Sequence, residues 1–208
     1  MSHVQGATLL AARRLDDVAA EKALLDQCRR QNYEAFGRVV DLYQARVLGF
    51  VRRMIRNEEE ALDITQEVFI KAFQGVASFD GRASLRSWLF RIAYHCCIDK
   101  VRRKERQPLI HSYEPTDENE ETFEFADHRW DPSEVLLNDE LRSVVEQSVA
   151  EMSEKLRSVL ILHDQENMGY EEIAQAMDIP VGTVKSRLFL ARAHLQEQVG
   201  RYLYGKGA

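Results

Sequence analysis

Residues 170–187 have the sequence YEEIAQAMDIPVGTVKSR. Apolar side chains recur three or four positions apart in this stretch, and an Asp-Ile-Pro step separates two helical patterns. Ile173 and Met177 are expected to bury the first helix, Ile179 to fill the turn, and Val184 to anchor the second helix. The pattern is typical of a helix-turn-helix, a motif built from helices alone.

The second helix of this motif carries short polar and cationic side chains on its outward face. They are Thr183, Lys185, Ser186, Arg187 and Arg192. Such a helix can lie in the major groove of duplex DNA, where hydroxyl and cationic groups reach base edges and phosphates. The alternative is a pair of helices used for protein contacts, but the number of features in register favours DNA.

The rest of the chain is also expected to be helical. Apolar residues recur at helical spacing over 33–55, 141–149 and 156–162. Asn57 should cap the next helix, with Leu62 and Val68 on its buried side. Ser84 should cap a third long helix that ends before Pro108. The sequence therefore predicts an all-α fold of two helical domains.

Charge is distributed unevenly along the chain. The whole chain has 28 basic and 34 acidic residues, a net charge of −6, yet residues 112–141 hold eleven acidic residues and Arg129 as their one base. This acidic stretch is typical of an extended linker, and a solvated loop without a task is the alternative. The predicted organisation is an N-terminal extension at 1–29, a first helical domain at 30–106, an acidic linker at 107–132 and a second helical domain at 133–208.

Aromatic residues alternate with cations along the helix that Ser84 begins. Rings that stack on bases beside cations that bind phosphates hold single-stranded nucleic acid, although rings at helical spacing are also common in protein cores. His95, Cys96 and Cys97 suggest a metal or thiol site. However, consecutive helical residues point about 100° apart, so the three cannot close on one ion without a distorted backbone.

Other classes of protein are disfavoured by what the sequence lacks. The three cysteines are an odd number, which argues for a reducing compartment and against a disulfide framework. The apolar runs are far shorter than a membrane span, so a cytoplasmic protein without membrane insertion is expected. The chain has no Gly-rich phosphate loop and no hydrolase or metalloprotease motif, so no catalytic residue, cofactor or metal is expected.

Taken in order, these features resemble those of the extracytoplasmic-function sigma factors, the smallest class of bacterial promoter-specificity subunits of RNA polymerase. The resemblance covers about residues 30–106 and 133–199. It rests on DITQEVFIKA at 63–72, SFDG at 78–81, WLFRIA at 88–93, and YEEIA at 170–174 followed by VGTVKSR at 181–187. The resemblance implies a sigma region 2 domain followed by a sigma region 4 domain.

The resemblance also implies a role for particular residues. Those matching the surface that docks on the clamp of core RNA polymerase are Asp63, Gln66, Glu67 and Lys71. Those matching the part that recognises and melts the minus-ten promoter element are Phe79, Arg82, Arg91, Tyr94, His95, Lys100, Arg102 and Arg103. His95 stands where many members carry Asn for a flipped base. The helix-turn-helix residues Thr183, Lys185, Ser186, Arg187 and Arg192 would read the minus-thirty-five element as duplex.

The implied function is therefore that of a non-catalytic subunit that directs promoter recognition, promoter melting and transcription initiation. Its expected partners are core RNA polymerase, promoter DNA as duplex and as non-template single strand, and an anti-sigma factor, with a stress or envelope signal upstream. An ordinary helix-turn-helix regulator with a helical sensing domain is the alternative. A thiol or metal sensor centred on His95, Cys96 and Cys97 is a third possibility.

Overall fold

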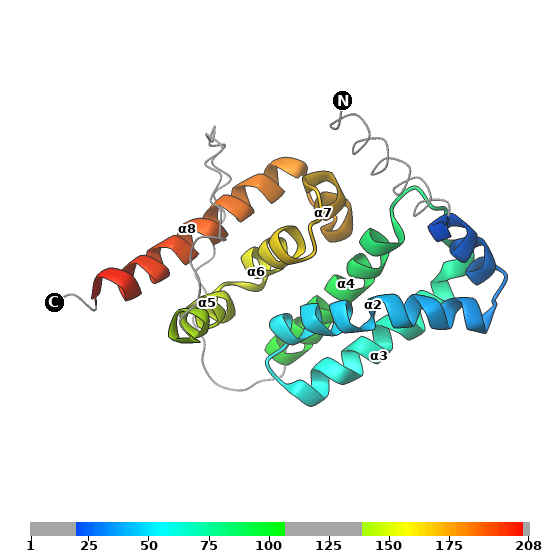
Figure 1. Cartoon of the computed structure of the whole chain (residues 1–208), viewed down its shortest axis with the longest axis horizontal. Coiled ribbons are helices and arrows are strands. Elements are labelled where there is room, and N and C mark those ends of the chain that lie inside the picture. Colours follow the sequence, from blue (N-terminus) through cyan, green and yellow to red (C-terminus); the bar gives the residue numbers. More distant parts are fainter. Residues whose placement is uncertain (1–19, 107–138, 206–208) are drawn as a thin grey trace, which may run out of the picture.

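The computed structural model describes residues 20–106 and 139–205, and every regular element in these two ranges is helical (Figure 1). In chain order they are residues 20–29, α2 (Tyr33–Met54), α3 (Glu58–Gly75), the 3-10 turn η1 (Val76–Ser78), α4 (Leu85–Arg106), α5 (Asp139–Glu151), α6 (Glu154–Leu160), the π turn η3 (Ile161–Gln165), α7 (Tyr170–Met177) and α8 (Val181–Gly205). The prediction of an all-α fold is confirmed. The predicted acidic linker at 107–132 lies outside the described residues.

The helix starts follow the predicted caps. The side chain of Asn57 accepts a hydrogen bond from the backbone N–H of Glu60 at 2.9 Å, and Ser84 accepts one from the backbone N–H of Ser87 at 3.1 Å. Each bond satisfies one of the N–H groups that the first turn of a helix leaves without an intrahelical acceptor. The starts of α3 and α4 are therefore fixed locally by the sequence.

Helices α2, α3 and α4 pack against one another to form the first lobe. Phe50 of α2 and Phe90 of α4 meet edge to face, with 5.6 Å between ring centroids, and Val68 of α3 is fully buried beside them. Burial of apolar side chains is the main stabilising contribution to such a bundle.

The helix at residues 20–29 belongs to the first lobe as well. Cys28 is fully buried in a second apolar cluster with residues of α2, α3 and α4. Arg29 donates two hydrogen bonds, of 2.8 and 3.0 Å, to the backbone carbonyl of Phe79. The end of the predicted N-terminal extension is thus an integral part of the first lobe rather than an appendage.

Helices α5 to α8 form the second lobe, in which the long helix α8 packs on α5, α6 and α7. Helix α7 ends at Asp178 in the left-handed backbone conformation, with φ 59°, and α8 begins at Val181. Ile173 and Val184 are fully buried and Met177 nearly so, as predicted. The helix-turn-helix is therefore confirmed, and it is formed by α7 and α8.

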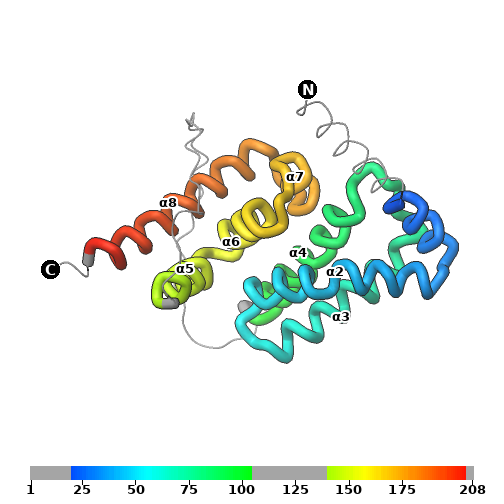
Figure 2. The backbone as a smooth tube through the Cα atoms, viewed as in Figure 1, coloured from blue at the N-terminus to red at the C-terminus, as the bar shows by residue number. Residues whose placement is uncertain are grey.

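The two lobes contact each other along α4 and α7, which lie side by side (Figure 2). One continuous apolar cluster includes Phe90 and Tyr94 of α4 together with Ile173 and Met177 of α7. The second lobe therefore packs directly on α4, the helix for which the resemblance predicts minus-ten recognition.

Candidate functional site

Four polar residues of α3 were predicted to dock on a partner, and we call them the docking face: Asp63, Gln66, Glu67 and Lys71. Asp63 and Gln66 are exposed, and Glu67 is half-buried. The Lys71 ammonium lies 2.7 Å from the Glu67 carboxylate, and this hydrogen bond raises the pKa of Lys71. The four side chains recur at helical spacing, so the structure brings them together on one side of α3.

The side of α3 that carries the docking face also exposes apolar residues. Leu62, which was predicted to be buried, is 44% exposed, and Ile70 is 55% exposed. The prediction for Leu62 is wrong because the buried side of α3 is set by Ala61, Ile64 and Val68, and Leu62 points about 100° away from Ala61. The position of Ile70 on this surface could have been predicted from the sequence, because Ile70 lies one helical turn after Gln66 and therefore on the same side of the helix.

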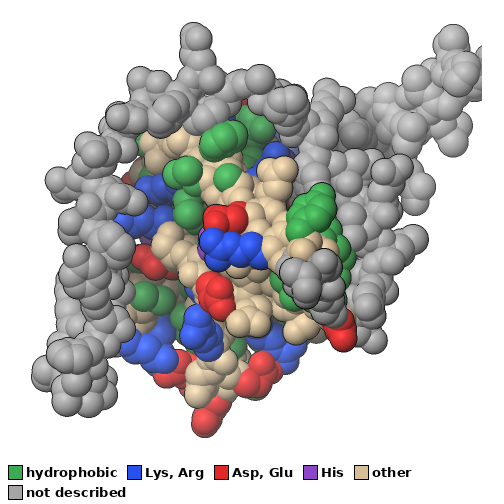
Figure 3. Space-filling model, turned by 90° about the vertical axis from the view of Figure 1, so that its left-hand side faces the viewer, with side chains coloured by type: hydrophobic (Ala, Val, Ile, Leu, Met, Phe, Trp, Pro, Cys, Tyr) green, Lys and Arg blue, Asp and Glu red, His purple; other side chains and the backbone are tan. Residues whose placement is uncertain are grey.

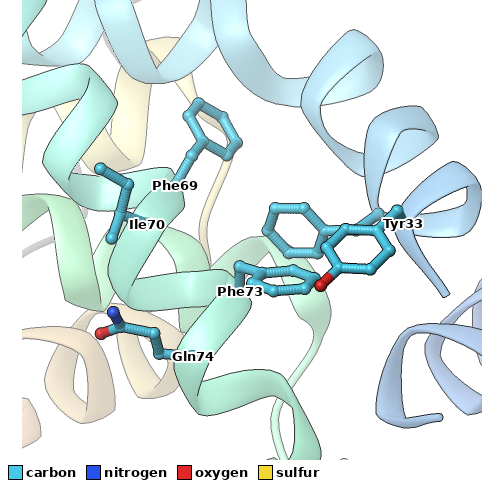
Figure 4. Close-up of a pocket in the computed structure, with 6 residues that line it drawn as sticks. Tyr33, Phe69, Ile70, Phe73 and Gln74 are labelled. Carbon is cyan, nitrogen blue, oxygen red and sulfur yellow. The ribbon is translucent and has the colours of Figure 1, made fainter. Parts of the chain in front are cut away.

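An apolar hollow of about 330 Å³ adjoins this surface between α2 and α3 (Figure 4). It is lined by Tyr33, Phe36, Phe69, Ile70, Phe73 and Gln74. The Tyr33 ring stacks on Phe73 at 5.2 Å and is 75% exposed. A surface that combines exposed apolar side chains with a polar row is typical of a protein interface rather than of a small-molecule site.

The cations predicted to bind minus-ten DNA are mostly exposed. Arg91, His95 and Arg102 lie on one side of α4, and Arg103 in its last turns is exposed as well. Arg82 is exposed before the start of α4, where it pairs with Asp80 at 3.0 Å. Partial burial and the neighbouring charge of Arg91 lower the pKa of His95, so its imidazole is neutral at neutral pH. A neutral imidazole both donates and accepts hydrogen bonds, which suits contact with a base edge.

Lys100 is half-buried, with its ammonium 3.2 Å from the carboxylate of Glu60. Lys104 pairs with the same carboxylate at 2.5 Å. The ion pair of Lys100 therefore links α4 to α3, and its ammonium is less available to a phosphate than the guanidinium groups of the exposed arginines.

The two aromatic residues predicted near the flipped base are buried. Phe79 is 7% exposed and stacks on Trp88, with 4.7 Å between ring centroids, and Tyr94 is 8% exposed. Burial raises the pKa of the Tyr94 phenol, and the nearby charge of Arg187 partly offsets the rise. In this conformation the structure does not bring Phe79 and Tyr94 together with the exposed cations in an open base pocket.

The helix-turn-helix residues are only partly accessible. Lys185 is exposed, with its ammonium 5.8 Å from the centre of the Tyr170 ring, whereas Thr183, Ser186 and Arg187 are half-buried. These residues share the first two turns of α8, as a groove-reading helix requires.

Arg192 differs from the other helix-turn-helix residues in the contacts that it makes. Its guanidinium lies 2.7 Å from the carboxylate of Asp164 in η3, so it is held within the second lobe rather than projecting beside Lys185. Near the far end of α8, basic, acidic and apolar side chains are intermixed on the surface, as Figure 3 shows for the described residues. Arg201, which pairs with Glu197 at 2.6 Å, is an example.

The structure gives no support to a metal or thiol site at residues 95–97. Burial raises the pKa of both Cys96 and Cys97, which disfavours the reactive thiolate. Within residues 20–106 and 139–205, no group of three or more His, Cys, Asp or Glu side chains is placed to hold a metal ion. Among the same residues, no helix is long and apolar enough to cross a membrane.

Both lobes match known families. A family model described as Sigma-70 region 2 matches residues 39–107, and one described as Sigma-70, region 4 matches residues 142–195. The RNA polymerase sigma-H factor of Pseudomonas aeruginosa is 35% identical over 83% of this chain and 90% of its own. The ECF RNA polymerase sigma-E factor of Escherichia coli is 31% identical over 89% of this chain and 97% of its own.

Solved structures share the fold. A structure titled as CnrH in complex with the cytosolic domain of CnrY matches with a TM-score of 0.62 and 21% identity over 87% of this chain and 97% of that one. RpoE from Bartonella quintana, in complex with the anti-sigma factor NepR, matches with a TM-score of 0.60 and 23% identity over 79% of this chain and 96% of that one. The region 2 and region 4 matches define a sigma-70 family protein. The chain belongs to that family, among its extracytoplasmic-function sigma factors.

Proposed function

We propose that this sigma factor binds core RNA polymerase through the docking face and directs transcription initiation at promoters that its two lobes recognise. The observation that carries the proposal is the presence of both sigma regions in one chain. The chain would act in the cytoplasm as a binding subunit, with no catalytic residue and no cofactor of its own.

Core polymerase would contact the side of α3 that carries the docking face. Exposed Leu62 and Ile70 would supply apolar area beside the charges of Asp63 and Lys71. Interfaces of this kind combine a desolvated apolar centre with charged residues that orient the partners.

The first lobe would hold the minus-ten element. The exposed cations would bind phosphates of the non-template strand, and neutral His95 would contact a base; these cations are Arg82, Arg91, Arg102 and Arg103, with Lys100 at the edge. Phe79 and Tyr94 would reach DNA only after a rearrangement, because both are buried. An extruded base loses stacking and pairing energy that such contacts must replace.

The second lobe would read the minus-thirty-five element as duplex. Replacing Lys185 or Arg187 by alanine should weaken binding to a minus-thirty-five duplex by about 1–3 kcal/mol each, because each removes a contact to base edges or phosphates. Fluorescence anisotropy with labelled duplex would measure the loss. Lys155→Ala, which removes an exposed lysine of α6, is the matched control and should bind almost as the unmodified chain does. Equal losses in all three variants would contradict the assignment.

Run-off transcription with purified core RNA polymerase tests the proposal directly. If the chain is a sigma factor, specific transcripts should form only when the chain is added to core enzyme. An ordinary helix-turn-helix regulator would leave core enzyme without promoter specificity. Equal transcription by core enzyme alone would overturn the proposal.

An anti-sigma factor is also expected to bind this chain. The support is the likeness in fold to RpoE, whose structure was solved in complex with the anti-sigma factor NepR.

A further inference from the structure

The helix at residues 20–29, which we call the N-terminal helix, packs beside the loop that joins η1 to α4 (Figure 1). This loop comprises residues 79–84 and carries two of the residues predicted to act in minus-ten recognition. Cys28 of the N-terminal helix is fully buried in one apolar cluster with Phe79, which begins the loop, and Leu85, which follows it. Both ends of the loop are therefore packed against the same helix.

Two side chains of the N-terminal helix also form hydrogen bonds with the backbone at the two ends of the loop. The guanidinium of Arg29 donates to the carbonyl of Phe79 from Nε at 3.0 Å and from Nη2 at 2.8 Å. Near the start of the helix, the Glu21 carboxylate accepts the backbone N–H of Leu85 at 2.9 Å. Glu21 and Arg29 are eight residues apart, which is about 12 Å of helix, so a rigid element sets the separation of the loop ends.

The orientation of Arg29 is fixed on its other side as well. Its Nη1 atom donates to the carboxylate of Asp26, one helical turn earlier, at 2.8 Å. The loop also passes close to this guanidinium, because a Cβ atom at Gly81 would lie 3.0 Å from it. Gly81 has a φ of 76°, in the left-handed region that favours glycine. Glycine at this position therefore permits both the bend of the loop and its contact with Arg29.

The contacts inside the loop are local. The backbone N–H of Arg82 donates to the carboxylate of Asp80 at 3.0 Å, and the guanidinium of Arg82 pairs with the same carboxylate. Asp80, Gly81 and Arg82 are all exposed. An exposed segment with few buried contacts samples many backbone conformations unless its ends are held. The bonds from Arg29 and Glu21 therefore restrict the conformations that this loop can adopt.

We propose that the N-terminal helix is a positioning element for minus-ten recognition, in which Arg29 and Glu21 hold the two ends of the loop in the conformation that binds the non-template strand. The inference rests on the proposed function, because it takes the loop to be part of the minus-ten surface. Arg29 and Glu21 are positioning residues, since they act through the loop. A loop that is ordered before binding loses less conformational entropy on binding, which increases affinity and the discrimination between bases.

The test measures DNA binding by holoenzyme reconstituted from the full chain and core RNA polymerase. The probe, which we call the minus-ten fork, comes from the promoter that gives the strongest run-off transcript, with its non-template strand unpaired over the minus-ten element. A scrambled fork has the same unpaired bases in another order. The ratio of the two affinities measures sequence discrimination, which a loss of nonspecific charge contacts does not change.

Replacing Arg29 by alanine should weaken binding of the minus-ten fork roughly fivefold to tenfold and reduce the discrimination ratio, because two charged hydrogen bonds to the loop are lost. Arg30→Ala is the matched control, since Arg30 is the next residue, is exposed and carries the same charge. This variant should bind both forks almost as the unmodified chain does. Equal weakening by the two variants, or unchanged binding by Arg29→Ala, would overturn the proposal.

Glu21 allows a test in which lost positioning and lost charge act in opposite directions. Glu21→Ala and Glu21→Gln both remove one negative charge, which by itself strengthens DNA binding. Glutamine retains a side-chain oxygen that can accept the N–H of Leu85, whereas alanine does not. We expect Glu21→Ala to weaken binding of the minus-ten fork by about threefold or more, and Glu21→Gln to bind it at least as tightly as the unmodified chain. Equal binding by these two variants would contradict the role of Glu21.

Two further measurements separate positioning from a purely structural role. Binding of a minus-thirty-five duplex by each full chain should stay unchanged, because the N-terminal helix belongs to the first lobe. Equal losses of minus-ten and minus-thirty-five binding in Arg29→Ala would show unfolding and overturn the positioning role. Arg29→Lys retains a donor for the Phe79 carbonyl and should recover part of the discrimination that Arg29→Ala loses. No recovery would also count against positioning.

The two proposals fail in distinguishable ways. If the unmodified chain supports no run-off transcription with core RNA polymerase, both proposals fail, because no minus-ten element is recognised. If it supports transcription and Arg29→Ala binds and discriminates the forks as the unmodified chain does, only the positioning role fails.

Discussion

Replacing Asp63 by arginine should reduce the affinity for core RNA polymerase at least tenfold. Asp63 is exposed on α3, one helical turn before Gln66 and Glu67, and its carboxylate faces solvent where the partner would dock. Reversal of this charge in an interface puts like charges opposite each other, which costs several kcal/mol, and about 1.4 kcal/mol already corresponds to a factor of ten. The measurement is competition with unmodified chain for core enzyme.

The control for Asp63→Arg is Glu197→Arg, which makes the same charge change on α8. Glu197 pairs with Arg201 one turn away on an exposed face, and an exposed ion pair of this kind contributes little to stability. Both variants should retain binding to a minus-thirty-five duplex, which shows that the second lobe is intact. If Asp63→Arg competes for core enzyme as well as the unmodified chain does, α3 is not the docking surface.

Replacing Arg157 by alanine should lower the free energy of unfolding by roughly 3 kcal/mol or more. The Arg157 residue is 8% exposed, and its guanidinium lies among backbone carbonyls at the junction of the lobes. It donates to the carbonyls of Ala150, Met152, Val149, Arg53 and Met54, at 2.7, 2.5, 3.0, 3.3 and 3.4 Å. Alanine would remove the Arg157 donor from the carbonyls of Met152, Arg53 and Met54, and each buried orphan costs about 1–3 kcal/mol unless water reaches it. The carbonyls of Ala150 and Val149 would keep the hydrogen bonds that they accept from Arg56 and from the backbone N–H of Met152.

Urea unfolding followed by circular dichroism measures the effect of Arg157→Ala. The control is Arg142→Ala. Arg142 is exposed and pairs with Glu146 on its own helix, so a change within about 0.5 kcal/mol is expected. Arg157→Lys should also be destabilising, because an ammonium has three donors and cannot reach the same five carbonyls. Equal stability of Arg157→Ala and Arg142→Ala would contradict this account.

Much of the local structure could be predicted from the sequence. Asn57 and Ser84 cap the helices they were expected to cap, and Ile173, Met177 and Val184 are buried in the helix-turn-helix. These features depend on neighbours within about four residues, where side-chain periodicity and capping chemistry act directly. Leu62 was misassigned because it lies at the border of an amphipathic face, where periodicity alone does not decide burial.

The candidate site could be predicted only in part. The docking face and the exposed cations of α4 lie where helical spacing places them, and their roles stay predictions until binding is measured. Burial of Phe79 against Trp88, capture of Arg192 by Asp164, and enclosure of Tyr94 between the lobes were not foreseen. Each arises from packing between separate elements, for which the sequence offers no local signal.

By itself the sequence determined two helical lobes, their caps and the helix-turn-helix, because helix periodicity and end effects are properties of short segments. The tertiary structure alone decided which predicted residues are accessible and that the lobes lie together. Arg86 and Glu172 are 86 residues apart in the chain, and nothing in either segment specifies the other. Their contact depends on the burial of α4 against α7, a free energy that arises only when both lobes have folded.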